Sequence, residues 1–544
     1  MAKSACLARA VRQPALGVVR RTRGLFGFTA AVAMGICLAG CGAGAARSSS
    51  GPVVFLTENM PANLDPRIGT DAQSQYLDSL IFSSLVSHDD RSDVTPDLAT
   101  AWDRPDPLTY VFHLRRGARF QNGQPLIAAD VKYTFDSILS GAVKTAKRGS
   151  FAEVGRVDAP DDFTVVFHLR QPSASFLWDL VRPAVGIVAR PGTPAGDADP
   201  AERPIGSGPF RFVRSVADEE VTLERNPEYF GERPGIDRVI FRIVPDAITR
   251  ALELRKGSAD LAAPNSLTPD MAAALGRDPR LRVSDQPGSN LNYVAFNLND
   301  RILAHRRVRQ ALAYATDRAE IIKYLLRGQA RIAYGLLPPS HWAYDAGVPR
   351  YDFDPARAER LLDQAGFPRG PGGVRFHLTL KTSTEESARL LGAVLQQQWR
   401  QVGVVLALRS LEFGTFYADI TRGSFQLCTL RWIGANNDPA IFYYVFDSAE
   451  VPPAGANRGH YRNPDLDRLL RLARVEPDRD RQKLLYVQAQ EIVARDLPYL
   501  TLWYADNVVV HDERIENVRI GPAGGFDFLG TIELGRLAAS SKPR

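Results

Sequence analysis

The chain has 544 residues, of which 45% are hydrophobic and 24% are charged, and its formal net charge is +6. This length exceeds one ordinary domain, and the apolar content suffices for two or more globular cores. The first 40 positions hold six Lys and Arg and no acid, so the remainder carries 61 basic and 61 acidic residues. That balance does not favour nucleic acid or another polyanionic partner.

Residues 1–40 have the composition of an export signal. A basic start precedes an uncharged apolar run over residues 25–40, which is short for a membrane span. The run ends in Leu38-Ala39-Gly40-Cys41, which resembles a bacterial lipobox, in which the cysteine thiol is acylated before cleavage. We predict a lipoprotein signal peptide over 1–40 with Cys41 as the lipidated residue. The alternatives are a retained anchor and a twin-arginine signal at Arg20-Arg21, which the following residues fit poorly.

Residues 41–50 are rich in Gly, Ala and Ser and are expected to form a flexible tether. Without the leader, and with Cys41 acylated, only Cys428 remains, which excludes an intramolecular disulfide. We therefore expect the exported body to be held together by its hydrophobic core. The mature chain contains no other uncharged segment long enough to cross a membrane.

Strand patterns of alternating or β-branched residues come first in the chain, at 53–57, 109–114, 164–169, 221–225, 239–244 and 376–380. Helix signals dominate the C-terminal half. Asp354-Pro355 predicts a helix start that runs to Gly366, and further helices are expected over 386–402, before a strand at 404–411, and over 481–495. Upstream, Asp317 and Glu320 resemble a capping box that restarts a helix. These mixed elements predict α/β lobes.

Motifs for catalysis and metal binding are missing from the sequence. It contains no G-x-S-x-G, H-E-x-x-H, C-x-x-C or P-loop pattern. Its eight histidines are dispersed, and His113 and His168 lie in two similar VFHLR strands, which we interpret as recurring strand chemistry and not as paired ligands. We therefore expect no catalytic residue, no metal and no cofactor, and a lipoprotein hydrolase is disfavoured.

Several ordered motifs cover nearly the whole mature chain. They are Asn63-Leu64-Asp65-Pro66, LRRGARFQNGQPLIAADVKYTFDSIL from Leu114, IGSGPF from Ile205, NYVAFNLNDRILAHRRVRQALAYATDRAEII from Asn292, and NPDLDRLLRLARVEPDRDRQKLLYVQAQEIVARDLPYL from Asn463. Read in this order, they resemble the family 5 extracellular solute-binding proteins, the peptide and nickel receptors of ABC importers.

The resemblance implies an α/β fold, a two-lobed periplasmic-binding-protein type II clamp with three domains and a two-strand hinge. The first domain would comprise 51–86, 201–300 and 498–544, the insert domain 87–200 and the second lobe 301–497. The hinge strands would lie near Val294 to Leu298 and Leu500 to Tyr504. A ligand that contacts both lobes only in the closed state would drive closure.

The function implied is capture of a small solute or short peptide and its delivery to an ABC permease and ATPase complex. The receptor would be a monomer, exported and lipid-anchored to the bacterial cell membrane on its periplasmic or extracellular face. A sensor or adhesin that uses the same clamp without a permease is an alternative from another class.

The stretch RWIGANNDP from Arg431 is expected to form one wall of the ligand cleft. In the family's peptide receptors, an aspartate that pairs with the peptide ammonium stands where this chain has Ala435, and a buried ammonium without a countercharge is costly. The remaining candidates in this stretch are Arg431, Trp432, Asn436, Asn437 and Asp438, and Asp438 is an alternative source of the countercharge.

The alternative interpretation of this stretch is that Trp432 and Phe442 to Tyr444 belong to the core, with the asparagines turning the chain and Asp438 capping or bracing the loop. On the opposite wall, Glu58, Asn59 and Met60 precede a turn whose Leu64-Asp65-Pro66 we interpret as structural. The ligand is therefore either a peptide or, because of Ala435, an oligosaccharide, an opine-like compound or a metal chelate.

Overall fold

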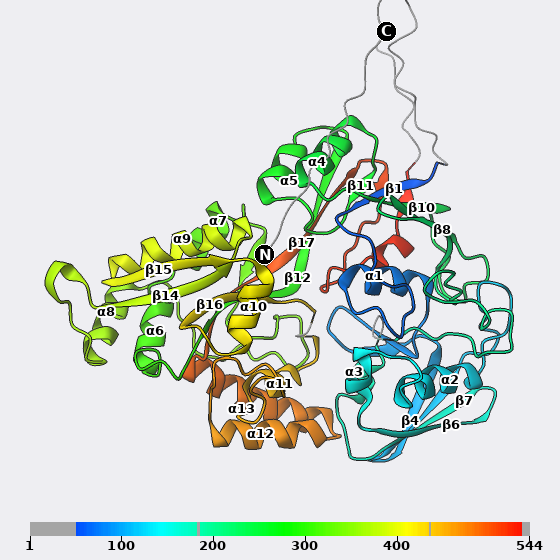
Figure 1. Ribbon diagram of the computed structural model, residues 1–544, viewed down its shortest axis with the longest axis horizontal. Helices are drawn as coiled ribbons and strands as arrows, with labels where there is room; N and C mark the ends of the chain where they lie inside the picture. Colours follow the sequence, from blue (N-terminus) through cyan, green and yellow to red (C-terminus); the bar gives the residue numbers. More distant parts are fainter. Residues whose placement is uncertain (1–50, 182–184, 435–436, 536–544) are drawn as a thin grey trace, which may run out of the picture. The chain divides into compact units, whose positions relative to one another are not determined.

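The computed structural model describes residues 51–181, 185–434 and 437–535, which form a mixed α/β structure (Figure 1). Its largest element is an 11-stranded sheet with the order β15-β14-β16-β12-β17-β11-β1-β10-β9-β8, and β13 pairs with β17 beside this path. The strands are β1 (Val53–Thr57), β8 (Phe210–Val216), β9 (Glu220–Arg225), β10 (Arg238–Ile243), β11 (Leu261–Ala262), β12 (Leu281–Phe296), β13 (Ala330–Ile332), β14 (Phe376–Ser383), β15 (Val404–Leu411), β16 (Leu427–Trp432) and β17 (Tyr499–Asp512). The predicted α/β class is confirmed.

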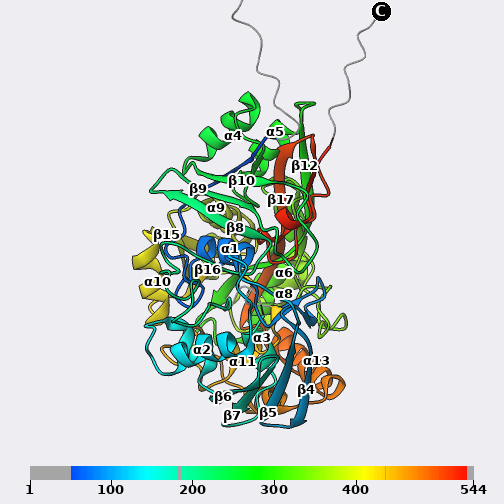
Figure 2. The same ribbon diagram turned by 90° about the vertical axis from the view of Figure 1, so that its right-hand side faces the viewer.

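Two long antiparallel strands, β12 and β17, connect the halves of this sheet, and they run side by side in Figures 1 and 2. Their register runs from Leu281 opposite Asp512 to Ala295 opposite Tyr499, with an irregularity between Gln286 and Asn290. On the far side of β12 lies β16, whereas β17 also pairs with β11, next to β1. These are the strands that the sequence proposed as a hinge, a role that stays a prediction, as do the domain boundaries.

A separate four-stranded antiparallel sheet has the order β4-β5-β7-β6, with α2 packed against β6 and β7. It comprises β4 (Ala99–Asp106), β5 (Thr109–Leu114), β6 (Val154–Asp161) and β7 (Thr164–Leu169). The two VFHLR strands are β5 and β7, which pair with each other. His113 Nε2 lies 2.7 Å from Asp103 Oδ2, and His168 Nε2 lies 3.0 Å from Asp158 Oδ2. Each histidine thus contacts an acid of its own hairpin.

The helices predicted at 354–366, 386–402 and 481–495 are present, together with helices that were not predicted from the sequence. They are α1 (Ala72–Ile81), α2 (Ala128–Leu139), α3 (Phe176–Asp179), α4 (Ala247–Lys256), α5 (Pro269–Leu275), α6 (Arg306–Tyr314), α7 (Arg318–Tyr324), α8 (Pro355–Gln364), α9 (Glu386–Gln401), α10 (Phe413–Thr421), α11 (Ile441–Phe446), α12 (Pro464–Val475) and α13 (Arg479–Asp496). Short 3-10 turns occur at Ala146–Phe151, Pro371–Gly373 and Asp527–Gly530, and two small hairpins pair β2 (Val86–His88) with β3 (Val94–Pro96) and β18 (Ile515–Glu516) with β19 (Glu533–Leu534).

The predicted helix starts have a clear local cause. Asp354 caps α8 by accepting a hydrogen bond from Arg357 N at 2.8 Å, with proline at the first helical position. Asp317 caps α7 in the same way, but its own N–H donates to Gln398 of α9 at 3.0 Å. The restart of the helix at Asp317 is therefore tied to a neighbouring helix as well as to a local cap.

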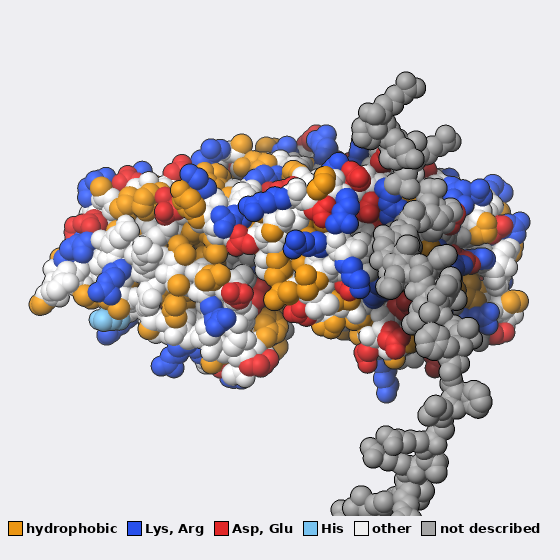
Figure 3. All heavy atoms as spheres, turned by 90° about the horizontal axis from the view of Figure 1, so that it is seen from above, with side chains coloured by type: hydrophobic (Ala, Val, Ile, Leu, Met, Phe, Trp, Pro, Cys, Tyr) orange, Lys and Arg blue, Asp and Glu red, His pale blue; other side chains and the backbone are white. Residues whose placement is uncertain are grey.

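The core is divided into several clusters along the sheet. One packs α6, α8 and α9 against β14 and β15, and another lies between β16 and the α11–α13 helices. The IGSGPF motif has a packing role, because a Cβ on Gly206 would lie 2.0 Å from the Ile81 carbonyl oxygen. Among the described residues, none of the helices combines the length and apolarity that a membrane crossing requires. On the face shown in Figure 3, basic and acidic side chains are interspersed.

Candidate functional site

The segment predicted to bind ligand starts at the end of β16, which lies between β14 and β12 in the large sheet. There Arg431 lies opposite Asn292 of β12, and Trp432 lies opposite Leu291. Because side chains alternate along a strand, Arg431 and Ile433 are exposed while Trp432 is half-buried. Two predicted positions, Ala435 and Asn436, lie outside the described residues, so their roles stay predictions.

Trp432 packs against the hydrophobic cluster beneath β16. Its ring is stacked on Tyr293 at a centroid distance of 6.1 Å, and Tyr444 meets it edge-on at 6.4 Å. The Arg458 guanidinium lies 5.3 Å from the ring centroid, a cation–π distance. The indole Nε1 is buried and has no hydrogen-bond partner among the described residues. Trp432 therefore supports the site through packing.

Asn437 is fixed by a buried histidine. His341 Nε2 donates to the Asn437 carbonyl oxygen at 2.9 Å, while its Nδ1 accepts from Ala343 N at 3.0 Å. Burial lowers the pKa of His341 to about 4, and the hydrogen bond to Asn437 opposes that shift. The ring is therefore neutral at pH 7, and it ties the site loop to the turn before α8.

Asp438 lies where the loop meets α3. Its carboxylate accepts from Ala440 N at 2.8 Å. Withdrawal from water raises the pKa of Asp438 to about 6, and the bonds from Ala440 and the Ser175 side chain oppose the shift. Burial also raises the pKa of Asp179, with a contribution from the nearby Asp438 charge, while Arg474 lowers it. Two carboxyl groups from distant segments thus meet beside the loop.

A cavity of about 610 Å³ brings residues from both halves of the sheet together. One side, here called the β1 wall, comprises Glu58 after β1, Ala247 and Arg250 of α4, and residues 265–269. The opposite side, the β16 wall, comprises residues of α9, α10 and the end of β16, including Arg431 and Ile433. Its floor is formed by β12 and β17. Of the predicted residues, Glu58 and Arg431 therefore line one cavity from opposite walls.

Each acid that lines the cavity has a basic partner. Glu58 Oε1 lies 2.8 Å from Arg250 Nη2, Glu385 Oε1 lies 3.7 Å from Arg431 Nη1, and Asp506 Oδ1 lies 3.1 Å from Arg331 Nε. Arg250 is buried and also donates to the main-chain oxygens of residues 244, 245 and 266. Glu58 is thus held in place by an immobile arginine, while its side chain remains about half exposed.

The other residues predicted to contact the ligand on the β1 side, Asn59 and Met60, do not lie beside Glu58 in the cavity lining. Asn59 is exposed, and Met60 packs partly against the core near β1; neither lines the cavity. Asp65 is buried and pairs with Arg67 at 2.7 Å, in agreement with the structural role predicted for this turn.

Several lining residues escaped the sequence interpretation. They are Arg250, Glu385, Phe413 and Tyr417, together with Arg458, which lies behind Tyr417. The spacing of Phe413 and Tyr417, four residues apart on one helix face, could have indicated an aromatic surface. The role of Arg250 follows only from the tertiary structure.

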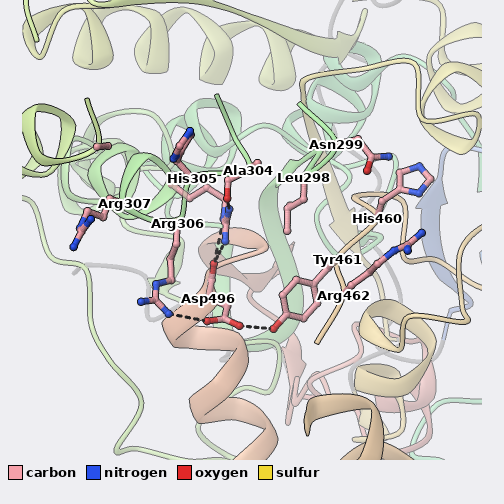
Figure 4. Close-up of a pocket in the computed structure, with 12 residues that line it drawn as sticks. Leu298, Asn299, Ala304, His305, Arg306, Arg307, His460, Tyr461, Arg462 and Asp496 are labelled. Carbon is pink, nitrogen blue, oxygen red and sulfur yellow. Dashed lines mark hydrogen bonds and ion pairs between the residues drawn. The ribbon is translucent and has the colours of Figure 1, made fainter. Parts of the chain in front are cut away.

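A second hollow of about 800 Å³ surrounds the start of α6 (Figure 4). Arg306 lies 3.3 Å from Asp496, which also accepts from the Tyr461 hydroxyl at 2.7 Å. Figure 4 shows Arg307 pointing away on one side and Arg462 lying on the other. The basic side chains that line this second hollow do not converge on a common point, so we do not assign a ligand site to it.

Comparison with known proteins identifies the class. The protein-family model described as "Bacterial extracellular solute-binding proteins, family 5 Middle" matches residues 93–451 of the sequence. The chain therefore belongs to this family. The resemblance and the two-lobed type II clamp predicted from sequence are thereby confirmed, and the family consists of substrate-binding proteins of transporters.

Individual relatives differ in what their names say they bind. The chain is 28% identical to the dipeptide-binding protein of Escherichia coli, covering 88% of this chain and 93% of that protein. It is also 28% identical to heme-binding protein A of Haemophilus influenzae, covering 89% and 92%. A solved structure of DppA from Helicobacter pylori with the peptide STSA is 26% identical, with a TM-score of 0.72 over 90% of this chain and 99% of that one.

Proposed function

We propose that this chain is the peptide-capturing receptor of an ABC importer and that its ligand binds in the 610 Å³ cavity between the β1 and β16 walls. The observation that carries the proposal is that residues far apart in sequence, Glu58 and Arg431, line this cavity from opposite sides. A volume of this size matches a small-molecule site. Relatives named for dipeptides support a peptide as the ligand.

We propose that binding closes the two walls about the β12 and β17 strands, and that the domains joined by these strands have the boundaries predicted from the sequence. Contacts outside the cavity already connect distant segments: Ala174 N donates to the Arg474 carbonyl at 2.8 Å, and Arg479 pairs with Asp93. A ligand that touches both walls stabilises the closed form by its differential affinity. No bond in the ligand needs to change.

Glu58 is the proposed acceptor for the peptide ammonium, since Ala435 offers no charge. One carboxylate oxygen of Glu58 is used by Arg250, and the other is available on a half-exposed side chain. The remaining proposed contacts, kept from the sequence interpretation, are Arg431, Trp432, Asn436, Asn437, Asp438, Asn59 and Met60.

The experiment is a calorimetric titration of the purified protein with a tripeptide and with the same tripeptide acetylated at its N-terminus. A hydrogen bond to a charged group contributes about 1.5–3 kcal/mol. Glu58→Gln should therefore lower the affinity for the free tripeptide by about 10- to 100-fold. The acetylated peptide should bind the variant and the wild type equally. Equal affinity of both proteins for the free peptide would show that Glu58 does not bind the peptide ammonium.

A non-peptide ligand is the second candidate, and Ala435 is the observation that favours it. Titration with an oligosaccharide and with a nickel–histidine chelate beside the tripeptide separates the two candidates. Binding of either compound without binding of the tripeptide would replace the peptide proposal.

We further propose that Cys41 is lipidated and holds a monomeric receptor on the outer side of the cell membrane, beside a permease and ATPase complex. Stable anchoring requires more than one acyl chain, which lipoprotein maturation supplies. Cys41→Ser should move the protein from the membrane fraction to the soluble fraction. Retention of the variant in the membrane would contradict the lipid anchor.

A further inference from the structure

Three large apolar side chains of the cavity are exposed to solvent. Phe413 is 58% exposed, Tyr417 42% and Ile433 53%, and all three line the β16 wall. Apolar side chains that are exposed together in a cavity mark a surface that a ligand or partner covers when it binds. These three side chains are called the apolar wall below.

The apolar wall is a product of local sequence. Glu412 caps α10 by accepting from Gly414 N at 2.9 Å and Thr415 N at 3.1 Å, which starts the helix at Phe413. Phe413 and Tyr417 are four residues apart and share the outer face of the helix, whereas Phe416 and Ile420 are buried. Ile433 joins them because it follows the exposed position at Arg431 by two residues.

The wall is also held rigid. The rings of Phe413 and Tyr417 are stacked at 5.9 Å with an interplanar angle of 21°. The Tyr417 hydroxyl accepts from Arg458 Nη2 at 3.0 Å, and the guanidinium lies 5.4 Å from the Tyr417 ring and 5.3 Å from Trp432. A surface that is already ordered costs little conformational entropy when a ligand binds.

The charges around the apolar wall disfavour a charged side chain there. On the β16 wall the lining acid is Glu385, which has Arg431 beside it, and Asp506 of β17 has Arg331. Glu58, the acid proposed to take the ammonium, lies on the opposite β1 wall. Behind Tyr417, Arg458 is buried, and no ion pair involving it occurs among the described residues. A lysine or arginine side chain entering here would lose hydration and meet this positive charge.

We infer that the ligand presents an apolar side chain, aliphatic or aromatic, to Phe413, Tyr417 and Ile433, and that the site rejects lysine or arginine in that place. This inference rests on the proposed function, because it specifies which peptides the receptor selects. It assigns selectivity to the β16 wall and leaves the ammonium to Glu58 on the β1 wall.

The test is competitive retention from an equimolar pool of free tripeptides. The purified protein is mixed with the pool, separated from unbound peptide by gel filtration, and the retained peptides are identified by mass spectrometry. One methylene more or less in an apolar pocket changes the discrimination between two ligands by about 10- to 200-fold. Peptides with Leu, Ile, Val or Phe should therefore be retained over Lys and Arg peptides by at least about tenfold.

Two variants and a matched control complete the design. Phe413→Ala and Ile433→Ala should each weaken the binding of one retained apolar peptide by about tenfold, as measured by calorimetric titration. Leu484→Ala removes a side chain that is 62% exposed on α13, away from the cavity, and should leave that binding unchanged. Thermal unfolding of each variant establishes that it is folded.

The two possible failures are distinguishable. Retention of peptides without an apolar bias, or equal behaviour of Phe413→Ala, Ile433→Ala and Leu484→Ala, would overturn this inference and leave the peptide receptor standing. Retention of no peptide at all by the wild type would overturn the proposed function, and the inference with it.

Discussion

The neutral His341 ring makes the stability of the site loop depend on pH. In the folded protein its pKa is lowered to about 4 from an ordinary value of 6.5, because the ring is buried between Asn437 and Ala343. Below pH 6.5 the unfolded chain binds a proton that the folded chain refuses. The contribution of His341 to the free energy of unfolding is therefore fully present above pH 6.5. It falls as the pH decreases towards 4 and is constant below that pH.

The size of the effect follows from the two pKa values. When the pH is lowered from 7.5 to 4.5, protonation of His341 stabilises the unfolded state more than the folded state. The two pKa values give a loss of unfolding free energy of about 2.5 kcal/mol. Asp438 acts in the opposite direction, since its folded pKa of about 6 exceeds the ordinary 3.8, so its contribution is lost as the pH rises through 6. A comparison between proteins that differ only at His341 cancels this term.

The measurement is urea unfolding of the wild type and His341→Gln at both pH values. The wild type should lose about 2.5 kcal/mol more than the variant on acidification. The ring itself can be followed by NMR of protein labelled at histidine. An identical pH dependence in both proteins, or a His341 titration near 6.5, would refute the assignment of a buried neutral ring.

Three other predictions follow from the packing. Trp432→Ala should lower the unfolding free energy by about 3 kcal/mol, because it removes the stacking on Tyr293 and the contact with Arg458; unchanged urea unfolding would contradict this. Arg327→Ala breaks an ion pair with Asp270 whose two side chains are both exposed, so it should change ligand affinity by less than about threefold in calorimetry; a larger loss would make the pair part of the closure mechanism. Cys428 is buried and its pKa is raised to about 12 by burial, so at pH 8 its peptide should be alkylated only in denaturant, as read by mass spectrometry; rapid labelling of the native protein would show that β16 opens.

The fold was predictable where its causes are local. Asp354 and Pro355 specify the start of α8, and alternation specifies β5 and β7. The order of the large sheet is not local, because β12 and β17 pair residues more than 200 positions apart. The whole-chain resemblance implied the two-lobed clamp and its two long strands, but the strand order of the sheet was not predicted.

The site was predictable in part for the same reason. Glu58 and Arg431 were selected from separate motifs and line one cavity. Trp432 was selected as an aromatic contact, but its ring packs beneath the strand, because the pairing with Leu291 directs it towards Tyr293. Phe413 and Tyr417 were missed because their exposure depends on how α10 lies against the sheet, which residue spacing does not specify.

The peptide-receptor function can be tested by native mass spectrometry of the protein purified from its own cells without refolding. We expect a retained mass that fragments into short peptides carrying apolar side chains, and we expect its loss when Phe413 and Ile433 are both replaced by alanine. A retained oligosaccharide, opine or metal chelate in place of a peptide would contradict this function.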